Sequence, residues 1–264
     1  LPIAWLAARF NPELRYYLVA HGIEVWRTFN AVERLALRGA ARIFCVSDYT
    51  RHELRRNCRL PDGRTVVLHN ALDPTFEIKA GQPLGQCPPV ILVVTRLTWA
   101  DRYKGVEHMI EAMPAIRASV PGAHLRIVGR GDDLPRLRAL RSKLELVEAI
   151  DFVGFIDDGR LAQEMRSCRL FALPSRKEGF GLVFLEAMAH GRPCLGARAG
   201  GIPEVITDGT GVLAEYGDVP GIAAAAVVGL RREWHEETIL NRARQFSYSQ
   251  FRAGLASVLD MSVI

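Results

Sequence analysis

The sequence of 264 residues contains no run of about 18 apolar residues, so it predicts no helix that spans a bilayer. The apolar stretch at residues 5–10 is much shorter and lacks the layout of a signal peptide. Cysteine is scarce too: the five cysteines are odd in number, far apart, and show no spacing typical of a zinc site. We therefore expect reduced thiols in a protein of the cytoplasm.

Acidic residues are fewer than basic ones, which gives the chain a net charge of +5 and a pI near 9.1. This excess suits binding of a nucleotide diphosphate, and it also suits peripheral contact with an anionic membrane surface. Basic residues crowd one predicted helix at 136–143, which is typical of a solvated helix face, so we predict no binding of nucleic acid. Hydrophobic residues make up 49% of the chain, enough for the core of one large or two modest domains.

From residue 90 onward, short apolar runs alternate with helical patterns. Over residues 105–118, for example, Val106, Met109, Ile110 and Met113 recur at helical spacing. Such alternation predicts βαβ units and a parallel sheet covered by helices on both faces, with ligands bound beyond the carboxyl ends of the strands. The strands predicted in this part lie at residues 90–94, 125–128, 150–153, 170–173, 193–195 and 212–214.

Before residue 75 the pattern is similar but shorter. It predicts strands at 15–20, 42–46 and 65–68, and the spacing of Thr50 and Glu53 predicts a capping box after Ser47. A Pro- and Gly-rich segment follows and is the best candidate for a linker. We expect a first domain over 1–75, a linker over 76–89, a second domain over 90–246 and a C-terminal part with a final helix over 247–264.

Residues 178–189 contain the strongest functional signal. Two carboxylates, Glu178 and Glu186, lie eight residues apart across a glycine-flanked turn that leads into an apolar helix. A helix that begins near Gly181 presents free N–H groups and its positive dipole end to an anion. Glycine at 179 and 181 lets a ligand approach the main chain. Because Glu186 leans back toward the start of its helix, both acids can face one ligand.

The order of segments around this motif resembles the donor-binding half of the family-4 retaining glycosyltransferases. An apolar strand at 170–173 precedes the motif, and segments 191–196 and 200–206 follow it; the family's Glu-x7-Glu motif is matched at Glu178 and Glu186. The resemblance covers nearly the whole chain and is strongest from 90 to 214. It implies an α/β protein of the GT-B type, with a Rossmann-like, doubly wound parallel sheet in a C-terminal donor domain. It also implies a partial N-terminal Rossmann-like domain, onto which the final helix packs back.

The chain also departs from this family. It opens with Leu1 and reaches almost at once what resembles the last strands of the acceptor-side domain, without the family's first strands and glycine-rich loop. Three strands alone leave an exposed sheet edge and uncovered apolar surface, which favour association. We therefore expect either a missing N-terminal segment or a partner, such as a second copy of the chain.

Transfer of a sugar from a nucleotide diphosphate requires stabilisation of the departing charge. The resemblance assigns the two phosphates to Arg96 and Lys104, with main-chain groups at Gly181 and Leu182. The Asp-x-Asp pattern of metal-dependent sugar transferases is absent from the sequence. We therefore predict no metal ion and no cofactor, and the nucleotide-diphosphate sugar is a substrate.

The two acids receive different roles by the resemblance. Glu186 accepts hydrogen bonds from the ribose hydroxyls, whereas Glu178 contacts the sugar together with Gly179 and Phe180. Glu178 is also a candidate nucleophile for a double displacement, because retaining sugar chemistry often proceeds in that way. The resemblance favours same-face attack instead, in which a donor phosphate oxygen takes the acceptor proton.

The remaining predicted site residues follow other strands. His21 lies where the family has an active-site histidine that faces the donor sugar, and Val153, Phe155 and Arg130 are predicted to contact the base. The Gly129–Gly131 segment matches only half of a dinucleotide fingerprint, which argues against a dehydrogenase. The segment 200–204 resembles a loop beside the donor sugar, although its simplest interpretation is a turn before a short helix.

The sequence thus predicts a cytoplasmic, metal-independent retaining glycosyltransferase that moves a hexose-type sugar to a saccharide or lipid-linked acceptor, with peripheral contact at the inner membrane face. Two alternatives remain open. A nucleotide-sugar epimerase has the same architecture and needs no separate acceptor, and a non-catalytic module binds the nucleotide sugar without transfer. The base, the sugar and the acceptor are not predicted.

Overall fold

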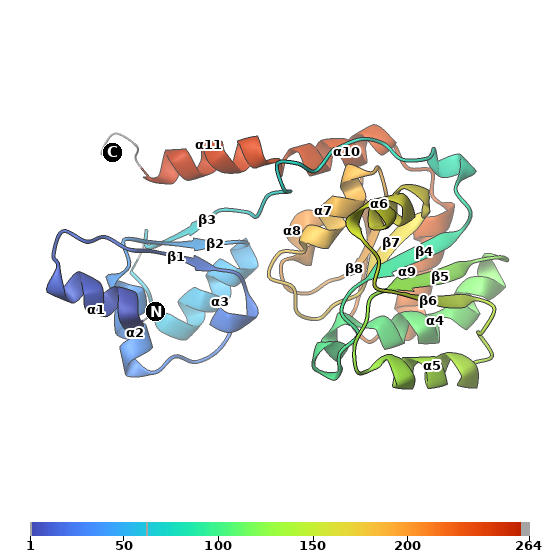
Figure 1. Cartoon of the computed structure of the whole chain (residues 1–264), viewed down its shortest axis with the longest axis horizontal. Coiled ribbons are helices and arrows are strands. Elements are labelled where there is room, and N and C mark those ends of the chain that lie inside the picture. The colour runs from blue at the N-terminus through green and yellow to red at the C-terminus, as the bar shows by residue number, and fades with distance from the viewer. Residues whose placement is uncertain (1, 62, 260–264) are drawn as a thin grey trace.

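The computed structural model describes residues 2–61 and 63–259, which form two lobes (Figure 1). The smaller lobe contains a parallel sheet of three strands in the order β1-β2-β3. Helices α1 to α3 lie on one side of this sheet, and α11 lies on the other (Figure 1). The elements of this lobe are β1 Tyr17–Ala20, β2 Arg42–Cys45, β3 Thr65–Val67, α1 Pro2–Phe10, the 3₁₀ turn η1 Ile23–Val25, α2 Ala31–Gly39, α3 Asp48–Cys58 and α11 Tyr248–Leu259.

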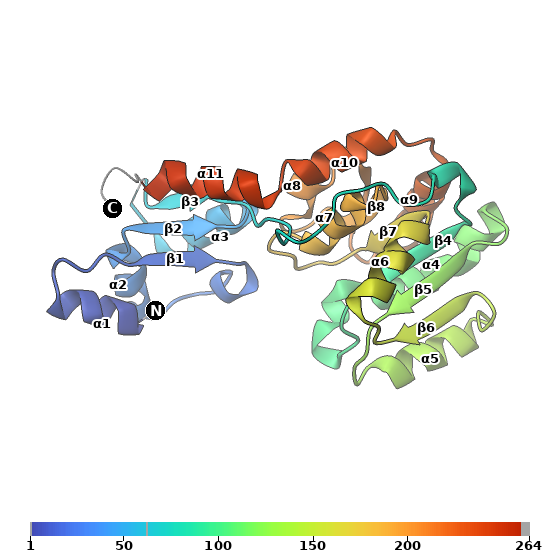
Figure 2. The same cartoon turned by 45° about the horizontal axis from the view of Figure 1, so that its top comes forward.

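The larger lobe contains a parallel sheet of six strands in the order β6-β5-β4-β7-β8-β9. Its strands are β4 Val90–Val94, β5 His124–Val128, β6 Ile150–Gly154, β7 Leu170–Leu173, β8 Cys194–Ala197 and β9 Gly211–Ala214. Its helices are α4 Val106–Ser119, α5 Leu134–Lys143, α6 Asp158–Ser167, α7 Leu182–Ala189, α8 Ile202–Val205, α9 Val219–Arg231 and α10 Glu236–Arg244, with 3₁₀ turns η2 Leu84–Gln86 and η3 Trp99–Lys104. Helices cover both faces of the sheet (Figures 1 and 2).

The large sheet is doubly wound, as the alternation of strands and helices predicts. All residues of β7 and β8 are buried, which explains why these strands read as short continuous apolar runs. The strand order reverses between β4 and β7, and ligands of open α/β sheets bind at the carboxyl ends of the strands on either side of such a reversal. Arg96 follows β4 and Glu178 follows β7, so the fold brings two predicted site residues to this position.

Two segments of the chain connect the lobes, and they are bonded to each other. The Leu72 N–H donates to the Phe246 carbonyl oxygen over 3.0 Å, where the segment before β4 meets the segment between α10 and α11. Helix α11 then lies beside β3 (Figure 2), with Leu68 close to Gly254. The rings of His69, Phe180 and Phe246 pack together at this crossing, with centroids 5.2–5.5 Å apart.

The predicted capping box of Thr50 and Glu53 is wrong. Helix α3 begins at Asp48, three residues before the start that an N-cap at Thr50 implies, and Ser47 is its N-cap, with its side-chain oxygen accepting from the Thr50 N–H over 3.0 Å. Thr50 therefore lies inside the first turn of the helix. Glu53 lies in the next turn and pairs with Arg56 over 2.8 Å. Ser47 is the N-cap because its hydroxyl oxygen accepts from the third N–H of the helix.

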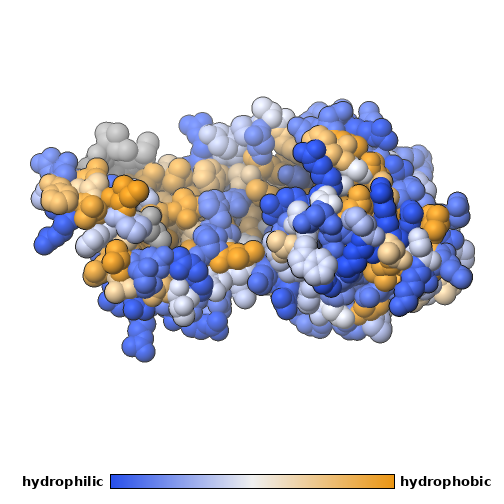
Figure 3. Space-filling model, turned by 60° about the horizontal axis from the view of Figure 1, so that its bottom comes forward, coloured by the Kyte–Doolittle hydropathy of each residue, from blue (hydrophilic) through white to orange (hydrophobic). Residues whose placement is uncertain are grey.

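The smaller lobe exposes apolar side chains. β1 is an edge strand, and its residues Tyr17 and Val19 are exposed. Ile3 and Phe10 of α1, the helix that precedes β1 in the sequence, are also exposed. Figure 3 shows apolar side chains gathered over this lobe, whereas the same face of the larger lobe is mostly hydrophilic. An edge strand of this kind can pair with a further strand, which is what the predicted association requires. The association itself stays a prediction.

Among the described helices, none has the length and apolar character needed to cross a membrane.

Candidate functional site

The start of α7 presents unpaired donors to the junction between the lobes. Gly181 precedes the helix with φ +102°, and a Cβ there would lie 2.7 Å from the Phe184 ring, so glycine is required. No side chain caps this helix end. Within residues 2–61 and 63–259, the N–H groups of Leu182 and Val183 have no acceptor. Free N–H groups at the positive end of a helix suit an anion.

A cation and a carboxylate meet beside this helix start. Lys104 Nζ and Glu178 Oε1 form an ion pair, with side chains 17% and 14% exposed. The pair joins η3, which follows β4, to the loop after β7. Gly105 makes this approach feasible, because a Cβ there would lie 2.4 Å from the Pro174 carbonyl oxygen. The structure thus brings Lys104 and Glu178 together, 74 residues apart in sequence.

Arg96 belongs to the same group of charges. Its side chain is 76% exposed and lies 3.1 Å from the buried carboxylate of Asp101. Burial, and next a hydrogen bond with Asp101, raises the pKa of Tyr103 to about 12. The charges of Glu178 and Arg96 also act on Tyr103, and Lys104 Nζ lies 5.4 Å from its ring centre. Asp101 and Tyr103 therefore support the two predicted phosphate-binding cations.

Main chains of the two lobes touch at Gly179. A Cβ at Gly179 would lie 1.7 Å from the His21 carbonyl oxygen, and one at Gly22 would lie 2.8 Å from Gly179 Cα. The loop 200–201 packs on the other side, where the Gly201 N–H donates to the Glu178 carbonyl oxygen over 2.8 Å. The Glu178 loop is therefore held between the end of β1 and the start of α8, which is the short helix expected after Gly200.

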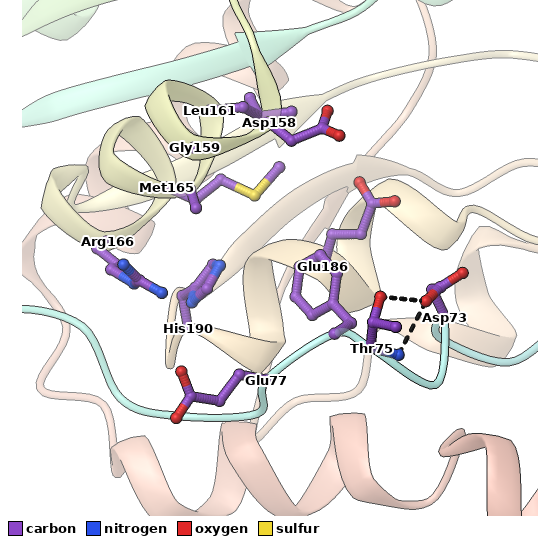
Figure 4. Close-up of a pocket in the computed structure, with 12 residues that line it drawn as sticks. Asp73, Thr75, Glu77, Asp158, Gly159, Leu161, Met165, Arg166, Glu186 and His190 are labelled. Atoms are coloured by element: carbon purple, nitrogen blue, oxygen red, sulfur yellow. Dashed lines mark hydrogen bonds between the residues drawn. The ribbon is translucent and has the colours of Figure 1, made fainter.

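Glu186 faces a cavity of about 580 Å³ between α6, α7 and the segment before β4 (Figure 4). Its carboxylate forms no hydrogen bond or ion pair with any described residue. Burial, and then the charge of Asp158, raises the pKa of Glu186. Figure 4 shows Glu186 and Asp158 toward one end of the cavity and Arg166 with His190 at the other. A half-buried acid without a partner is available to ligand hydroxyls.

A second cavity connects this region with the junction between the lobes. It has a volume of about 350 Å³ and includes His21, Leu182 and Asp73 in its lining. Asp73 also lines the cavity of Glu186, so the two cavities are neighbours. The predicted ribose-binding residue and the predicted active-site histidine consequently open onto adjoining parts of one cleft.

The predicted base-binding residues form a group beside the loop after β4, which carries Arg96. The Arg130 guanidinium lies 4.9 Å from the ring centre of Phe155, which is 71% exposed. Val153 is half-buried at the end of β6. The loop that carries Arg130 packs on the loop after β4, because a Cβ at Gly131 would lie 2.1 Å from the Leu97 carbonyl oxygen. An exposed aromatic ring and a guanidinium offer stacking surfaces for a planar ligand.

Phe180, a predicted sugar-binding residue, packs its side chain at the crossing between the lobes. Its side chain is 3% exposed and stacks on His69 in the aromatic contact between the lobes. Only the main chain of Phe180 can therefore contact a sugar.

The sequence analysis did not predict that Asp101, Tyr103 and Asp158 belong to the site. The first two lie within residues 101–105, the segment that contains Lys104.

No three His, Cys, Asp or Glu side chains gather as a metal site in the part of the chain that the structure describes. The predictions of metal independence and of no cofactor are not decided by this. Arg96 and Lys104 follow β4, and Lys104 pairs with Glu178 in the loop that leads to the start of α7.

Comparisons with known proteins agree with this fold. The match to a solved structure of Anabaena Alr3699/HepE in complex with UDP covers 98% of this chain and 76% of that chain, with a TM-score of 0.83 and 24% identity. N-acetyl-alpha-D-glucosaminyl L-malate synthase of Bacillus anthracis is 40% identical over 153 residues, 58% of this chain. A GDP-mannose-dependent alpha-(1-6)-phosphatidylinositol monomannoside mannosyltransferase of Mycolicibacterium smegmatis is 32% identical over 246 residues, 85% of this chain. The matches span 39% and 63% of the lengths of these two curated relatives.

The architecture is an α/β fold of the GT-B type. A family model described as Glycosyl transferases group 1 matches residues 88–232, more than half of the chain, and a Glycosyltransferase Family 4 model matches residues 1–76. The chain therefore belongs to the group 1 glycosyl transferases, of the family-4 type that the Glu-x7-Glu motif indicates.

Proposed function

We propose that this protein transfers a hexose-type sugar from a nucleotide-diphosphate sugar to a saccharide or lipid-linked acceptor, with retention and without a metal ion. The observation that carries the proposal is the meeting of Lys104 and Glu178 at the free start of α7. A diphosphate placed there meets one half-buried cation and two unpaired N–H groups, and its sugar lies against Glu178. Family membership supports the reaction class.

Each group has a distinct task in the proposed reaction. Arg96, Lys104 and the N–H groups of Leu182 and Val183 stabilise the charge that develops on the diphosphate as its bond to the anomeric carbon breaks. Glu178 and the His21 side chain orient sugar hydroxyls from opposite lobes. The acceptor oxygen then bonds to the same face of that carbon, and its proton passes to a phosphate oxygen of the leaving diphosphate.

The base and the ribose occupy the other end of the cleft in this proposal. Glu186 accepts from both ribose hydroxyls, because a carboxylate has two oxygens for a vicinal diol. Its raised pKa reflects burial and a neighbouring acid, and hydroxyl donors relieve both costs. Phe155, Arg130 and the main chain at Val153 face the base.

The decisive experiment follows radiolabelled UDP-glucose and GDP-mannose in separate reactions. These donors are chosen because one structural neighbour is in complex with UDP-glucose and one relative depends on GDP-mannose. We expect slow release of the nucleotide diphosphate without acceptor, and transfer to lipid or saccharide extract with an α-linked product from an α-linked donor. An epimer formed without acceptor would support the epimerase instead. Tight donor binding without hydrolysis or transfer would support a binding module.

Metal removal is a separate test. We expect transfer to persist within about twofold after dialysis against EDTA, because protein cations neutralise the diphosphate. Restoration by MgCl₂ of an activity lost on dialysis would contradict metal independence. The same assay on a known metal-dependent transferase is the positive control.

The contact between the lobes at Gly179 gives a further prediction. Gly179→Ala places a methyl group 1.7 Å from the His21 carbonyl oxygen, so the lobes must separate. We expect roughly a tenfold loss of transfer, because a misplacement of about 1 Å is costly in catalysis. Affinity for the nucleotide diphosphate, measured by calorimetry, should change little, since that ligand binds the larger lobe. Gly85→Ala is the control, because its Cβ would meet no atom within 4 Å. Equal transfer rates for both variants would contradict an active arrangement in which Gly179 contacts His21. We call this arrangement of the lobes closed.

A further inference from the structure

The first turn of α3 is completed by a residue from the other lobe. The N–H groups of Asp48 and Tyr49 donate to the two carboxylate oxygens of Glu204 over 2.7 and 2.8 Å. The third N–H of the helix, at Thr50, donates to Ser47. Two of the three first N–H groups of α3 thus depend on a carboxylate that is about 155 residues away in the sequence.

Glu204 is itself anchored. It lies in α8, and the Arg242 guanidinium donates to the carbonyl oxygens of Glu204 and Val205, the latter over 3.1 Å. Arg242 belongs to α10, and its guanidinium lies 4.8 Å from the ring centre of Phe246 at the crossing between the lobes. The carboxylate is therefore presented from a fixed backbone and not from a mobile loop.

The same short segment contacts the proposed sugar site. The Gly201 N–H donates to the Glu178 carbonyl oxygen, and a Cβ at Gly200 would lie 2.4 Å from that oxygen. A displacement of α8 relative to α3 therefore moves the Glu178 loop relative to His21. The contact of Glu204 with α3 and the contact of His21 with Gly179 must form together.

We propose that Glu204 is a positioning residue that holds the two lobes in the closed arrangement by capping α3 across the cleft. A carboxylate at a helix start is stabilised by charge-assisted hydrogen bonds and by the helix dipole. When the lobes separate, both N–H groups and the carboxylate return to water, so the contact favours only the closed state. The catalytic consequence rests on the proposed function, whereas the conformational claim does not.

The conformational claim is tested with two labels on the intact protein. The native cysteines are all buried, so Arg38→Cys on α2 and Arg138→Cys on α5 provide exposed labelling sites, one on each lobe. Distances between spin labels are measured for the parent, Glu204→Ala and Glu204→Gln. We expect one narrow distance distribution for the parent, a broad and longer one for Glu204→Ala, and an intermediate one for Glu204→Gln, which keeps one oxygen acceptor.

Kinetics of the same variants test the catalytic consequence. We expect kcat for sugar transfer to fall roughly ten- to a hundredfold in Glu204→Ala, the effect of losing a hydrogen bond to a charged group. Binding of UDP or GDP should stay within about twofold, because Glu204 is not in the nucleotide site. Glu237→Gln is the control, since Glu237 forms an exposed ion pair with Arg244 on the same helix, α10.

The outcomes separate the two claims. Unchanged label distances in Glu204→Ala, with circular dichroism showing a folded protein, would overturn the proposal. If Glu204→Ala does not fold, a Glu204→Gln protein with the parent distances and the parent kcat would overturn it equally. Absence of transfer in the parent and in every variant, together with broadened distances in Glu204→Ala, would remove the proposed function and leave the cross-lobe cap in place.

Discussion

Lys104→Met should abolish most of the sugar transfer, with a fall in kcat of roughly a hundred- to a thousandfold, the range seen when one donor to a developing negative charge is removed. Lys104 is the less exposed of the two predicted phosphate-binding cations. It forms an ion pair with Glu178, which is predicted to bind the sugar. Methionine has nearly the same length, so the charge is removed while the packing is kept. Steady-state kinetics with labelled donor measure kcat and KM separately.

Two lysines act as controls for this variant. Lys143→Met removes an exposed charge on α5 at a distance from the cleft. Lys177→Met removes a charge that lies 5.8 Å from the same Tyr103 ring but has no pairing with Glu178. We expect both controls to keep kcat within about threefold. A loss in Lys177→Met as large as in Lys104→Met would mean that general positive charge, and not the position of Lys104, matters.

The ion pair of Lys104 and Glu178 is consistent with the proposed function. Each group neutralises the other, which avoids an unpaired charge at a half-buried position. In the proposed reaction, the diphosphate is a more negative partner for Lys104, and the sugar hydroxyls donate to Glu178. This exchange of partners requires the two residues to be neighbours.

The sequence predicts the large sheet well because its strands are buried on both faces. β4 and β7 follow the predicted ranges residue for residue, since each is a short apolar run between turn signals. α7 begins at Leu182, one residue after the predicted helix start, because Gly181 with its positive φ fixes the boundary. Such elements are decided by local composition and periodicity.

Contacts between distant segments are less predictable. No local pattern indicates that Glu204 completes α3, since the donors and the acceptor are far apart in sequence. The side chain of Phe180 faces the crossing between the lobes because His69 and Phe246 meet there, and neither belongs to the motif. The predicted box of Thr50 and Glu53 failed for the opposite reason, because the nearby Ser47 competes for the same helix start.

Glu186→Ala should weaken binding of the nucleotide diphosphate by about ten- to a hundredfold and also stabilise the fold at neutral pH. The carboxylate faces a cavity and pairs with no described residue, so its removal breaks no hydrogen bond or ion pair with them. Because burial raises the pKa of Glu186, the folded state holds its proton more tightly than the unfolded state does. The resulting stability is present below the ordinary pKa of a glutamate and is lost as the pH rises through the raised pKa. At neutral pH the ionised acid therefore costs free energy, which alanine removes.

Calorimetry with UDP and GDP, and urea unfolding at pH 4 and pH 7.5, measure the two effects on the same protein. Glu111→Ala is the matched control, because Glu111 is an exposed acid with no partner among the described residues. Its helix, α4, lies on the other face of the large sheet from α7 (Figure 1). We expect Glu186→Ala to gain stability over the parent at pH 7.5 and to show a smaller gain at pH 4, whereas Glu111→Ala changes little in either assay. Unchanged affinity in Glu186→Ala would remove the assignment of the ribose site. Unchanged stability at pH 7.5 would instead show that the ionised carboxylate is well solvated in its cavity, so that only a binding role remains for it.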